Sequence, residues 1–302
     1  MKAKKLNLDI ADRITEFESL MRKFLVKRIL YKLIFRGKGL EFEGYREYSP
    51  DDDAQDIDWK ASMRSGETLV KKYIEERDLN VVFVVDISEN MVFGSTKKLK
   101  CEYAAELSAA LSHLIINSGD KIGFVLFDDN IKKMVSPKGG LKQFYLFVDN
   151  LSNPSNYGGN SNLKSTISYL SNYLSRSTSV VIIISDFIRM NKNIKEDLTL
   201  FAKNFETMAL IVNDPLDKTL PNLNREMVVE DPVSGEQLII NPHIAKKEYE
   251  RKAREHSEMI KRVFEDSGVD YLNLMTDKPF VVDLAQFMAA RADKKKYIMS
   301  KS

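Results

Sequence analysis

The chain has 302 residues, of which 43% are hydrophobic, so it can bury a sizeable core and is not disordered over most of its length. Its formal net charge of +2 argues against a protein whose main task is to neutralise nucleic-acid phosphates. A single cysteine, Cys101, excludes an internal disulfide and a cysteine-rich zinc site, which fits a reducing compartment. With no secretory signal and no run of about 20 apolar residues, a cytoplasmic location is expected.

Residues 1–36 are basic, with ten Lys/Arg against four Asp/Glu. Apolar residues such as Ile14, Phe17 and Leu20 recur at helical spacing, which predicts a helix that packs on the main domain. A basic amphipathic helix can also lie on a membrane surface, so peripheral membrane contact through this segment is kept as an alternative.

Residues 41–58 have the opposite charge, with eight Asp/Glu against one Arg. Alternation around Phe42 and Tyr45 predicts a strand, which ends at Pro50 in an acidic turn. A second strand-like segment, "ETLVKKYIEE", follows.

From Val81 onward, apolar strands alternate with helix-length segments. The strands are "VVFVVD", "KIGFVLFD", "IKKMVSP", "SVVIIISD", "TMALIVN" and "VDYLNLMT". Helices are expected over residues 97–117, 139–151, 162–175, 193–204, 243–267 and 279–291, with a hairpin near 226–240. This pattern predicts an α/β fold with a mainly parallel, doubly wound sheet covered by helices on both faces.

The two most apolar strands both end in aspartate, at Asp86 and Asp186. Ligands of such sheets bind beyond the carboxyl ends of the strands, at a topological switch point. If the two strands are neighbours, both carboxylates reach the same crevice, and Ser161 on the glycine-containing loop "GGNSN" adds a hydroxyl.

Beyond Asp86, oxygen-bearing side chains alternate in the order Asp86, Ser88, Asn90. Carboxylate, hydroxyl and amide oxygens without histidine or cysteine suit a hard cation such as Mg²⁺, with Mn²⁺ and Ca²⁺ left open. A bound metal with one open position could be completed by a carboxylate of another protein. Each residue taken alone is more simply a turn former or a helix N-cap.

The segments "VVFVVDISENM", "GGNSNL" and "VVIIISDF" resemble the von Willebrand factor A domain. Its metal-ion-dependent adhesion site reads Asp-x-Ser-x-Ser, then a Thr, then an Asp. Asp86, Ser88 and Asp186 match that pattern, Ser161 falls at the Thr position, and Asn90 replaces the last Ser. The resemblance implies metal ligands at Asp86, Ser88, Asn90, Ser161 and Asp186.

The segment "GKGLEFEGYREYSPDDDAQDIDWKASMRSGETLVKKYIEE" is similar to the leader of a bacterial von Willebrand A-like family, domain of unknown function 58. The similarity covers roughly residues 30–291 and includes the hairpin and the segment "PFVVDLAQFMAAR". Members of that family resemble accessory factors of MoxR-type AAA+ ATPases, which implies binding to such an ATPase or its client.

We therefore expect a leader over 1–78, a von Willebrand A-like domain over 79–291 and a flexible tail over 292–302. Trp59 is expected to fill the seam between leader and domain or, alternatively, to contact a partner. Asp52 and Asp53 are interpreted as part of a solvated turn or as a partner contact, and Arg46 is expected to pair with this acidic cluster internally.

The expected function is a non-enzymatic protein-interaction module, with no nucleic-acid partner. A metal-free structural scaffold with a vestigial site is one alternative, its contacts made by the leader and the 226–240 hairpin. A metal-dependent phosphoesterase is another, although no HExxH, Walker, GxSxG or GxGxxG motif occurs and only three histidines are present.

Overall fold

The computed structural model describes residues 6–24, 41–49, 52, 57–74, 79–231 and 234–299. The chain forms two compact units: residues 37–78 make the smaller one, and the segments before and after them make the larger one. The two units are described separately below.

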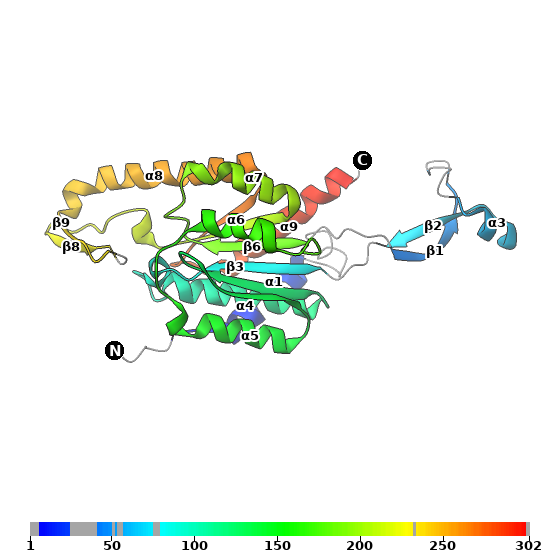
Figure 1. Ribbon diagram of the computed structural model, residues 1–302, viewed down its shortest axis with the longest axis horizontal. Coiled ribbons are helices and arrows are strands. Elements are labelled where there is room, and N and C mark those ends of the chain that lie inside the picture. Colours follow the sequence, from blue (N-terminus) through cyan, green and yellow to red (C-terminus); the bar gives the residue numbers. More distant parts are fainter. Residues whose placement is uncertain are drawn as a thin grey trace. The chain divides into compact units, whose positions relative to one another are not determined.

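The larger unit is built on a six-stranded sheet with the strand order β10-β7-β6-β3-β4-β5 (Figure 1). All neighbouring strands run parallel except β4 and β5, which pair antiparallel at one edge. The strands are β3 (Asn80–Asp86), β4 (Lys121–Phe127), β5 (Ile131–Lys138), β6 (Val180–Ser185), β7 (Glu206–Asn213) and β10 (Asp270–Met275). The predicted mainly parallel α/β sheet is confirmed.

Helices cover both faces of this sheet because its central strands are apolar on both sides (Figure 1). Alternate residues of β3 enter different cores: Phe83 packs with helices α1, α4, α5 and α9, and Val84 with α6, α7 and α8. The helices are α1 (Ile10–Phe24), α4 (Lys100–Asn117), α5 (Leu141–Ser152), α6 (Leu163–Tyr173), α7 (Lys195–Asn204), α8 (Pro242–Ser267) and α9 (Phe280–Met299). Short 3-10 turns are η2 (Glu89–Val92), η3 (Pro154–Asn156), η4 (Lys192–Ile194) and η5 (Pro215–Asp217).

Helix α1 packs on the larger unit, as its apolar spacing predicts. Phe17 is fully buried in the core that α4 and α9 share, and Ile10, Ile14 and Leu20 pack against it. The sequence grouped residues 1–78 as one leader, whereas the structure places α1 with the sheet and residues 37–78 in the smaller unit. The physical reason is the apolar face of α1, which is buried against α4 and α9.

The last helix was predicted to end at residue 291, and the structure extends it; the predicted flexibility of residues 292–302 stays a prediction. Helix α9 continues to Met299. Residues 292–299 contain neither Gly nor Pro and include Ala, Lys and Met, which favour helix, so nothing stops α9 at 291. Residues 300–302 lie outside the described part of the chain.

The predicted hairpin is present as β8 (Met227–Glu230) and β9 (Gln237–Ile240), which pair antiparallel. Across the described ranges, no helix combines the length and the apolar character needed to span a membrane.

The smaller unit is an antiparallel pair of strands, β1 (Glu41–Glu47) and β2 (Leu69–Ile74), with helix α3 (Trp59–Ser65) between them in sequence. Asp58 caps α3, because its Oδ1 accepts hydrogen bonds from the Lys60 and Ala61 amides at 3.1 Å each. Gly66 ends the helix with a positive φ of 80°. The segment Asp58–Trp59–Lys60 therefore forms the start of helix α3.

Candidate functional site

The candidate site lies at the carboxyl ends of β3 and β6, which are neighbours in the sheet. From β3 the chain passes through α4 to β4 on one side, while β6 pairs with β3 on the other, so the strand order reverses here. Val85 of β3 pairs with Ile184 of β6. That register places Asp86 level with Ser185, the last residue of β6, which Asp186 follows.

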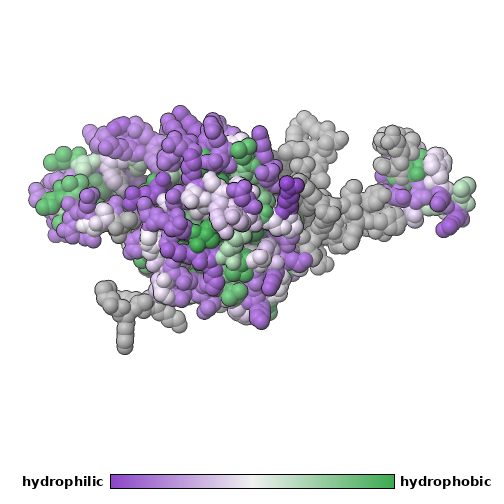
Figure 2. Space-filling view, in the orientation of Figure 1, coloured by the Kyte–Doolittle hydropathy of each residue, from purple (hydrophilic) through white to green (hydrophobic). Residues whose placement is uncertain are grey.

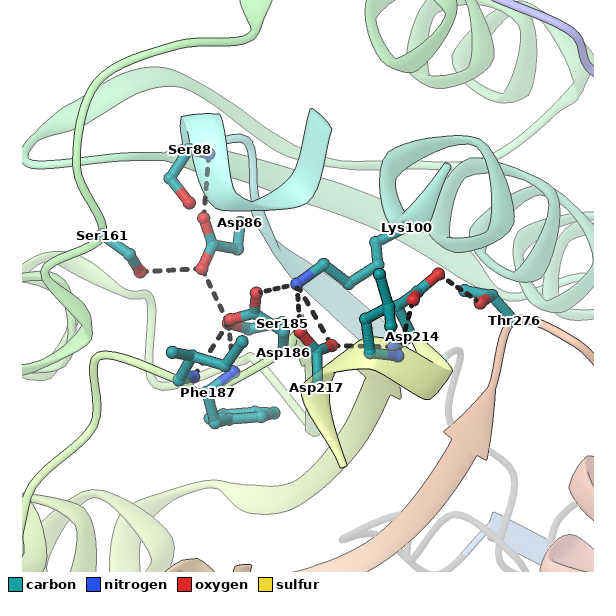
Figure 3. Close-up of polar contacts among 12 residues, drawn as sticks. Asp86, Ser88, Lys100, Ser161, Ser185, Asp186, Phe187, Asp214, Asp217 and Thr276 are labelled. Atoms are coloured by element: carbon teal, nitrogen blue, oxygen red, sulfur yellow. Dashed lines mark hydrogen bonds and ion pairs between the residues drawn. The ribbon is translucent and has the colours of Figure 1, made fainter. Parts of the chain in front are cut away.

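Asp86 is fully buried and accepts three hydrogen bonds (Figure 3). Its Oδ1 accepts the Ser88 amide at 2.9 Å, and its Oδ2 accepts the hydroxyls of Ser161 and Ser185 at 2.7 Å each. The structure thus brings together residues from the β3 turn, the loop before α6 and strand β6. Of the predicted residues, Ser88 and Ser161 contact Asp86 directly.

The loop that carries Ser161 is held against the β3 turn by backbone hydrogen bonds. The Gly158 amide donates to the Ile87 carbonyl at 2.9 Å, and the Glu89 amide donates to the Gly159 carbonyl at 2.9 Å. Gly159 has a φ of +75°, and a Cβ there would lie 2.7 Å from Asp128 Oδ2. Only glycine satisfies both conditions, so Gly159 lets the loop approach closely enough to deliver Ser161.

Asp186 lies directly after β6 and is 1% exposed. Its Oδ1 accepts the Ile188 amide at 3.0 Å, and its Oδ2 forms a 2.6 Å ion pair with the ammonium of Lys100, at the start of α4. The next residue, Phe187, has a φ of 55°, which is unusual for a bulky side chain. This turn sends the chain away from the sheet while Asp186 stays at its edge.

Lys100 also faces a second carboxylate, that of Asp217 in η5, at 3.3 Å from Oδ2 (Figure 3). Asp217 is held in turn by the Asp214 amide, which donates to its Oδ2 at 2.7 Å. Asp214, at the end of β7, is fully buried and accepts hydrogen bonds from Ser95, Leu216 and Thr276. The polar network therefore extends from β3 to the ends of β7 and β10.

The electrostatics of the site are dominated by buried carboxylates. Burial, together with the charge of Asp186, raises the pKa of Asp86. Burial also raises the pKa of Asp217, and the Lys100 charge opposes this only in part. For Lys100, burial acts against the charged form, but the carboxylates of Asp186 and Asp217 outweigh it and raise its pKa, so it stays an ammonium.

The residues present fit a hard cation by the chemistry of their donors. The Ser88 hydroxyl is buried and has no hydrogen-bond partner in the described part of the chain, and its oxygen is of a type that can bind a cation. Asn90 Nδ2 is also without a partner among the described residues, but an amide NH2 donates hydrogen bonds and does not support a cation site. No group of three or more His, Cys, Asp or Glu side chains is placed to hold a metal among the described residues, so hydroxyl oxygens would have to contribute. Asp86, Ser88, Ser161 and Asp186 offer an all-oxygen set of this kind. Their role as metal ligands, with that of Asn90, stays a prediction.

Asn162, the residue after Ser161, does not join the site. Its side chain caps α6 by accepting the Ser165 amide at 3.1 Å, which is the simpler role that residues of this type often have.

Sequence reasoning missed Lys100, Ser185, Asp214 and Asp217. Two of them carried a signal: Ser185 directly precedes Asp186, and Asp214 follows the apolar strand β7 just as Asp86 ends β3. Lys100 carried none, because it follows the charged "KKL" stretch and looks like part of a solvated surface.

The predicted partner-binding residues belong to the smaller unit. Trp59, the first residue of α3, is 65% exposed, and its predicted roles in the seam or in partner contact remain predictions. Arg46 pairs with Asp52, as expected for an internal ion pair, and its hydrogen bonds lower the pKa of Asp52 to about 2. Asp53 lies outside the described residues.

The strand order and the strand-end site define an α/β protein of the von Willebrand A-like class. The crystal structure of the conserved hypothetical protein BatB from Bacteroides thetaiotaomicron shares the fold, with a TM-score of 0.51 and 16% identity, over 71% of this chain and 99% of that one. The SpRpn10 VWA domain also matches, with a TM-score of 0.38 and 14% identity over 70% of this chain and 95% of that one, too distantly to add to the argument.

Residues 44–259 match the family described as "Protein of unknown function DUF58", and the chain belongs to this family. An uncharacterized protein of Mycobacterium tuberculosis is 27% identical over 259 residues, which cover 84% of this chain and 80% of that protein. A relative from Mycobacterium bovis matches to the same extent.

Proposed function

We propose that this protein is a non-enzymatic protein-interaction module that binds its partner at the carboxyl edge of the sheet, between β3 and β6. The observation that supports this most is that three separate chain segments meet at Asp86: the hydroxyls of Ser161 and Ser185 donate to it, and the charge of nearby Asp186 raises its pKa (Figure 3). Such a cluster costs desolvation energy, so its presence at the switch point of an α/β sheet points to a functional site.

A hard cation, Mg²⁺ first, is proposed to complete the site through oxygens of Asp86, Ser88, Asn90, Ser161 and Asp186. When bound, it would supply a Lewis-acidic position that accepts a carboxylate oxygen of the partner. The residues of the chain orient that position: Asp86 fixes the Ser161 hydroxyl, and the Gly158–Gly159 loop holds Ser161 against the β3 turn. The partner is proposed, from the resemblance to the family, to be a MoxR-type AAA+ ATPase or its client.

Affinity capture from the native cell, with Mg²⁺ and with EDTA, tests this proposal. We expect Ser161→Ala to lose at least about tenfold in partner recovery, because Asp86 loses a hydrogen bond and the site a ligand. Ser165→Ala is a matched control, since Ser165 is exposed and lies only four residues further along. Equal recovery with both variants, and with chelator, would overturn the proposed docking edge.

A second candidate is a metal-independent scaffold that binds through the β8–β9 hairpin. Figure 2 shows apolar residues gathered at the end of the view where Figure 1 places this hairpin. Val228, Leu238 and Ile239 are 56%, 64% and 67% exposed. Exposed apolar side chains that cluster on one surface often mark a site of protein contact. Such a contact would also stabilise the hairpin, because an isolated two-stranded hairpin is only marginally stable in water.

A further inference from the structure

Lys100 has an unusual environment for a lysine. Its side chain is 1% exposed, and its ammonium lies 2.6 Å from Asp186 Oδ2 and 3.3 and 3.5 Å from the two carboxylate oxygens of Asp217. Lysine is rarely buried unless it is paired, because the ammonium is strongly hydrated. The Lys100 ammonium is therefore a buried cation that lies between the carboxylates of Asp186 and Asp217.

This ammonium and a bound metal would compete for the same oxygen. Asp186 Oδ1 accepts the Ile188 amide, and Oδ2 lies 2.6 Å from the Lys100 ammonium, so a divalent cation on this carboxylate would share it with Lys100. Two cations on one carboxylate repel each other strongly in a buried site. A metal bound to Asp186 would therefore disfavour the present position of the ammonium.

Asp217 gives the ammonium a second position. Its carboxylate is already within 3.5 Å of the Lys100 Nζ and is fixed by the Asp214 amide. A small movement of the flexible lysine stem toward Asp217 would keep the ammonium paired. Such a movement avoids the large penalty of a buried charge without a partner.

We propose that Lys100 is the resident counter-ion of the site: it holds Asp186 when no metal is bound, and a divalent cation binds by displacing it onto Asp217. This inference rests on the metal-binding part of the proposed function. The Lys100 charge would offset the repulsion between the buried carboxylates of the site when no metal is bound. Displacement of the ammonium also makes metal affinity a property that Lys100 and Asp217 set, although neither residue is a ligand.

Calorimetric titration of the purified full chain with Mg²⁺ and Mn²⁺ tests the proposal. Lys100→Met removes the competing charge at similar length, so we expect metal to bind about ten- to a hundredfold more tightly than to the wild type. Lys218→Met is the matched control. Lys218 lies near the same carboxylates but donates to the Ser257 hydroxyl, and its removal should change affinity by less than about threefold.

Asp217→Asn tests the second position without removing the lysine. With no charged alternative, the ammonium stays on Asp186, and metal binding should weaken by about tenfold. In the Lys100→Met background the same substitution should have an effect of less than about threefold, because no ammonium remains to be moved. This coupling is what separates displacement from a simple loss of negative charge.

The outcomes are distinct for the two proposals. If the wild type binds metal and Lys100→Met binds no more tightly, or if Asp217→Asn acts equally in both backgrounds, the counter-ion role is wrong while the metal site stands. If wild type and Lys100→Met are both silent at millimolar metal with intact circular dichroism, the metal site itself is wrong. Should Lys100→Met fail to fold, the Asp217→Asn result decides: unchanged affinity overturns the displacement.

Discussion

Two lysine–aspartate pairs in this protein have almost the same length and opposite surroundings. Lys100 and Asp186 lie 2.6 Å apart with both side chains 1% exposed, while Lys195 and Asp266 lie 2.7 Å apart at 49% and 54% exposure. We expect Asp186→Asn to cost about 3 kcal/mol of unfolding free energy, because it leaves the buried ammonium with Asp217 alone. Asp266→Asn should cost less than about 1 kcal/mol, because water screens the exposed pair.

Urea denaturation of the two variants beside the wild type measures this difference. The m-value of each variant should equal that of the wild type, so that the shift in the urea midpoint reports a change in the free energy of unfolding. Similar costs for the two substitutions would mean that burial does not distinguish the pairs, and the electrostatic account of the site would fail.

Cys101 is predicted to be chemically inert in the folded protein. Burial raises the pKa of its thiol to about 12, and the charge of neighbouring Glu102 acts in the same direction. Because the thiolate is the reactive form, DTNB at pH 8 should modify Cys101 only after denaturation. Rapid stoichiometric modification of the native protein would show that α4 opens far more readily than its burial implies.

At the residue scale, the sequence predicted the two strand-end aspartates of the cluster but not Ser185, Asp217 or the Lys100 ammonium that pairs with the carboxylates. Asp86 and Asp186 could be found because each ends an apolar strand, and parallel neighbouring strands bring their carboxyl ends together. Lys100 could not be found, since its burial depends on the packing of α4 against the sheet and on Asp217, more than a hundred residues away in sequence.

At the scale of elements, the conformation of the loop before α6 depends on Gly159. Gly159→Ala would place a Cβ 2.7 Å from Asp128 Oδ2 at a φ of +75°, and Asp128 is itself fixed by the Asn130 amide and by Lys132. We expect a loss of about 2–3 kcal/mol in unfolding free energy, from backbone strain and overlap together.

Gly235→Ala is the control for this loop. Gly235 has a φ of +70° with nothing within 4 Å of an added Cβ, so only the backbone term of about 1 kcal/mol should remain. Equal losses in the two variants, again from urea denaturation, would show that the close approach to Asp128 contributes nothing.

The elements themselves were largely predictable, and the exceptions have physical reasons. β3 and β6 are apolar at successive positions, which is typical of strands covered on both faces, and each is buried along nearly its whole length. The last helix was expected to end at residue 291, with a flexible tail after it. Local propensity instead continues the helix to Met299.

On the scale of the larger unit, two surfaces compete for the role of docking site. The carboxyl edge between β3 and β6 is polar, with the half-buried Ser161 hydroxyl hydrogen-bonded to buried Asp86, and we propose that it recognises an acidic group of a partner through a cation. The β8–β9 hairpin is apolar and exposed, and it would recognise a partner by burial of Leu238 and Ile239. The first mechanism depends on divalent metal, whereas the second does not.

The double substitution Leu238→Ser, Ile239→Ser separates these two mechanisms. Both side chains are more than 60% exposed, so the change should cost less than about 1 kcal/mol of stability and leave metal titration untouched. If the proposed edge is the docking site, captured partner falls with Ser161→Ala and stays within about twofold with the hairpin double variant. In the reverse pattern, capture falls with the hairpin double variant and is unaffected by Ser161→Ala and by EDTA. That result would assign partner binding to the hairpin, because the double variant changes Leu238 and Ile239 and leaves the cluster around Asp86 intact. The carboxylate cluster would then be a structural feature of the sheet.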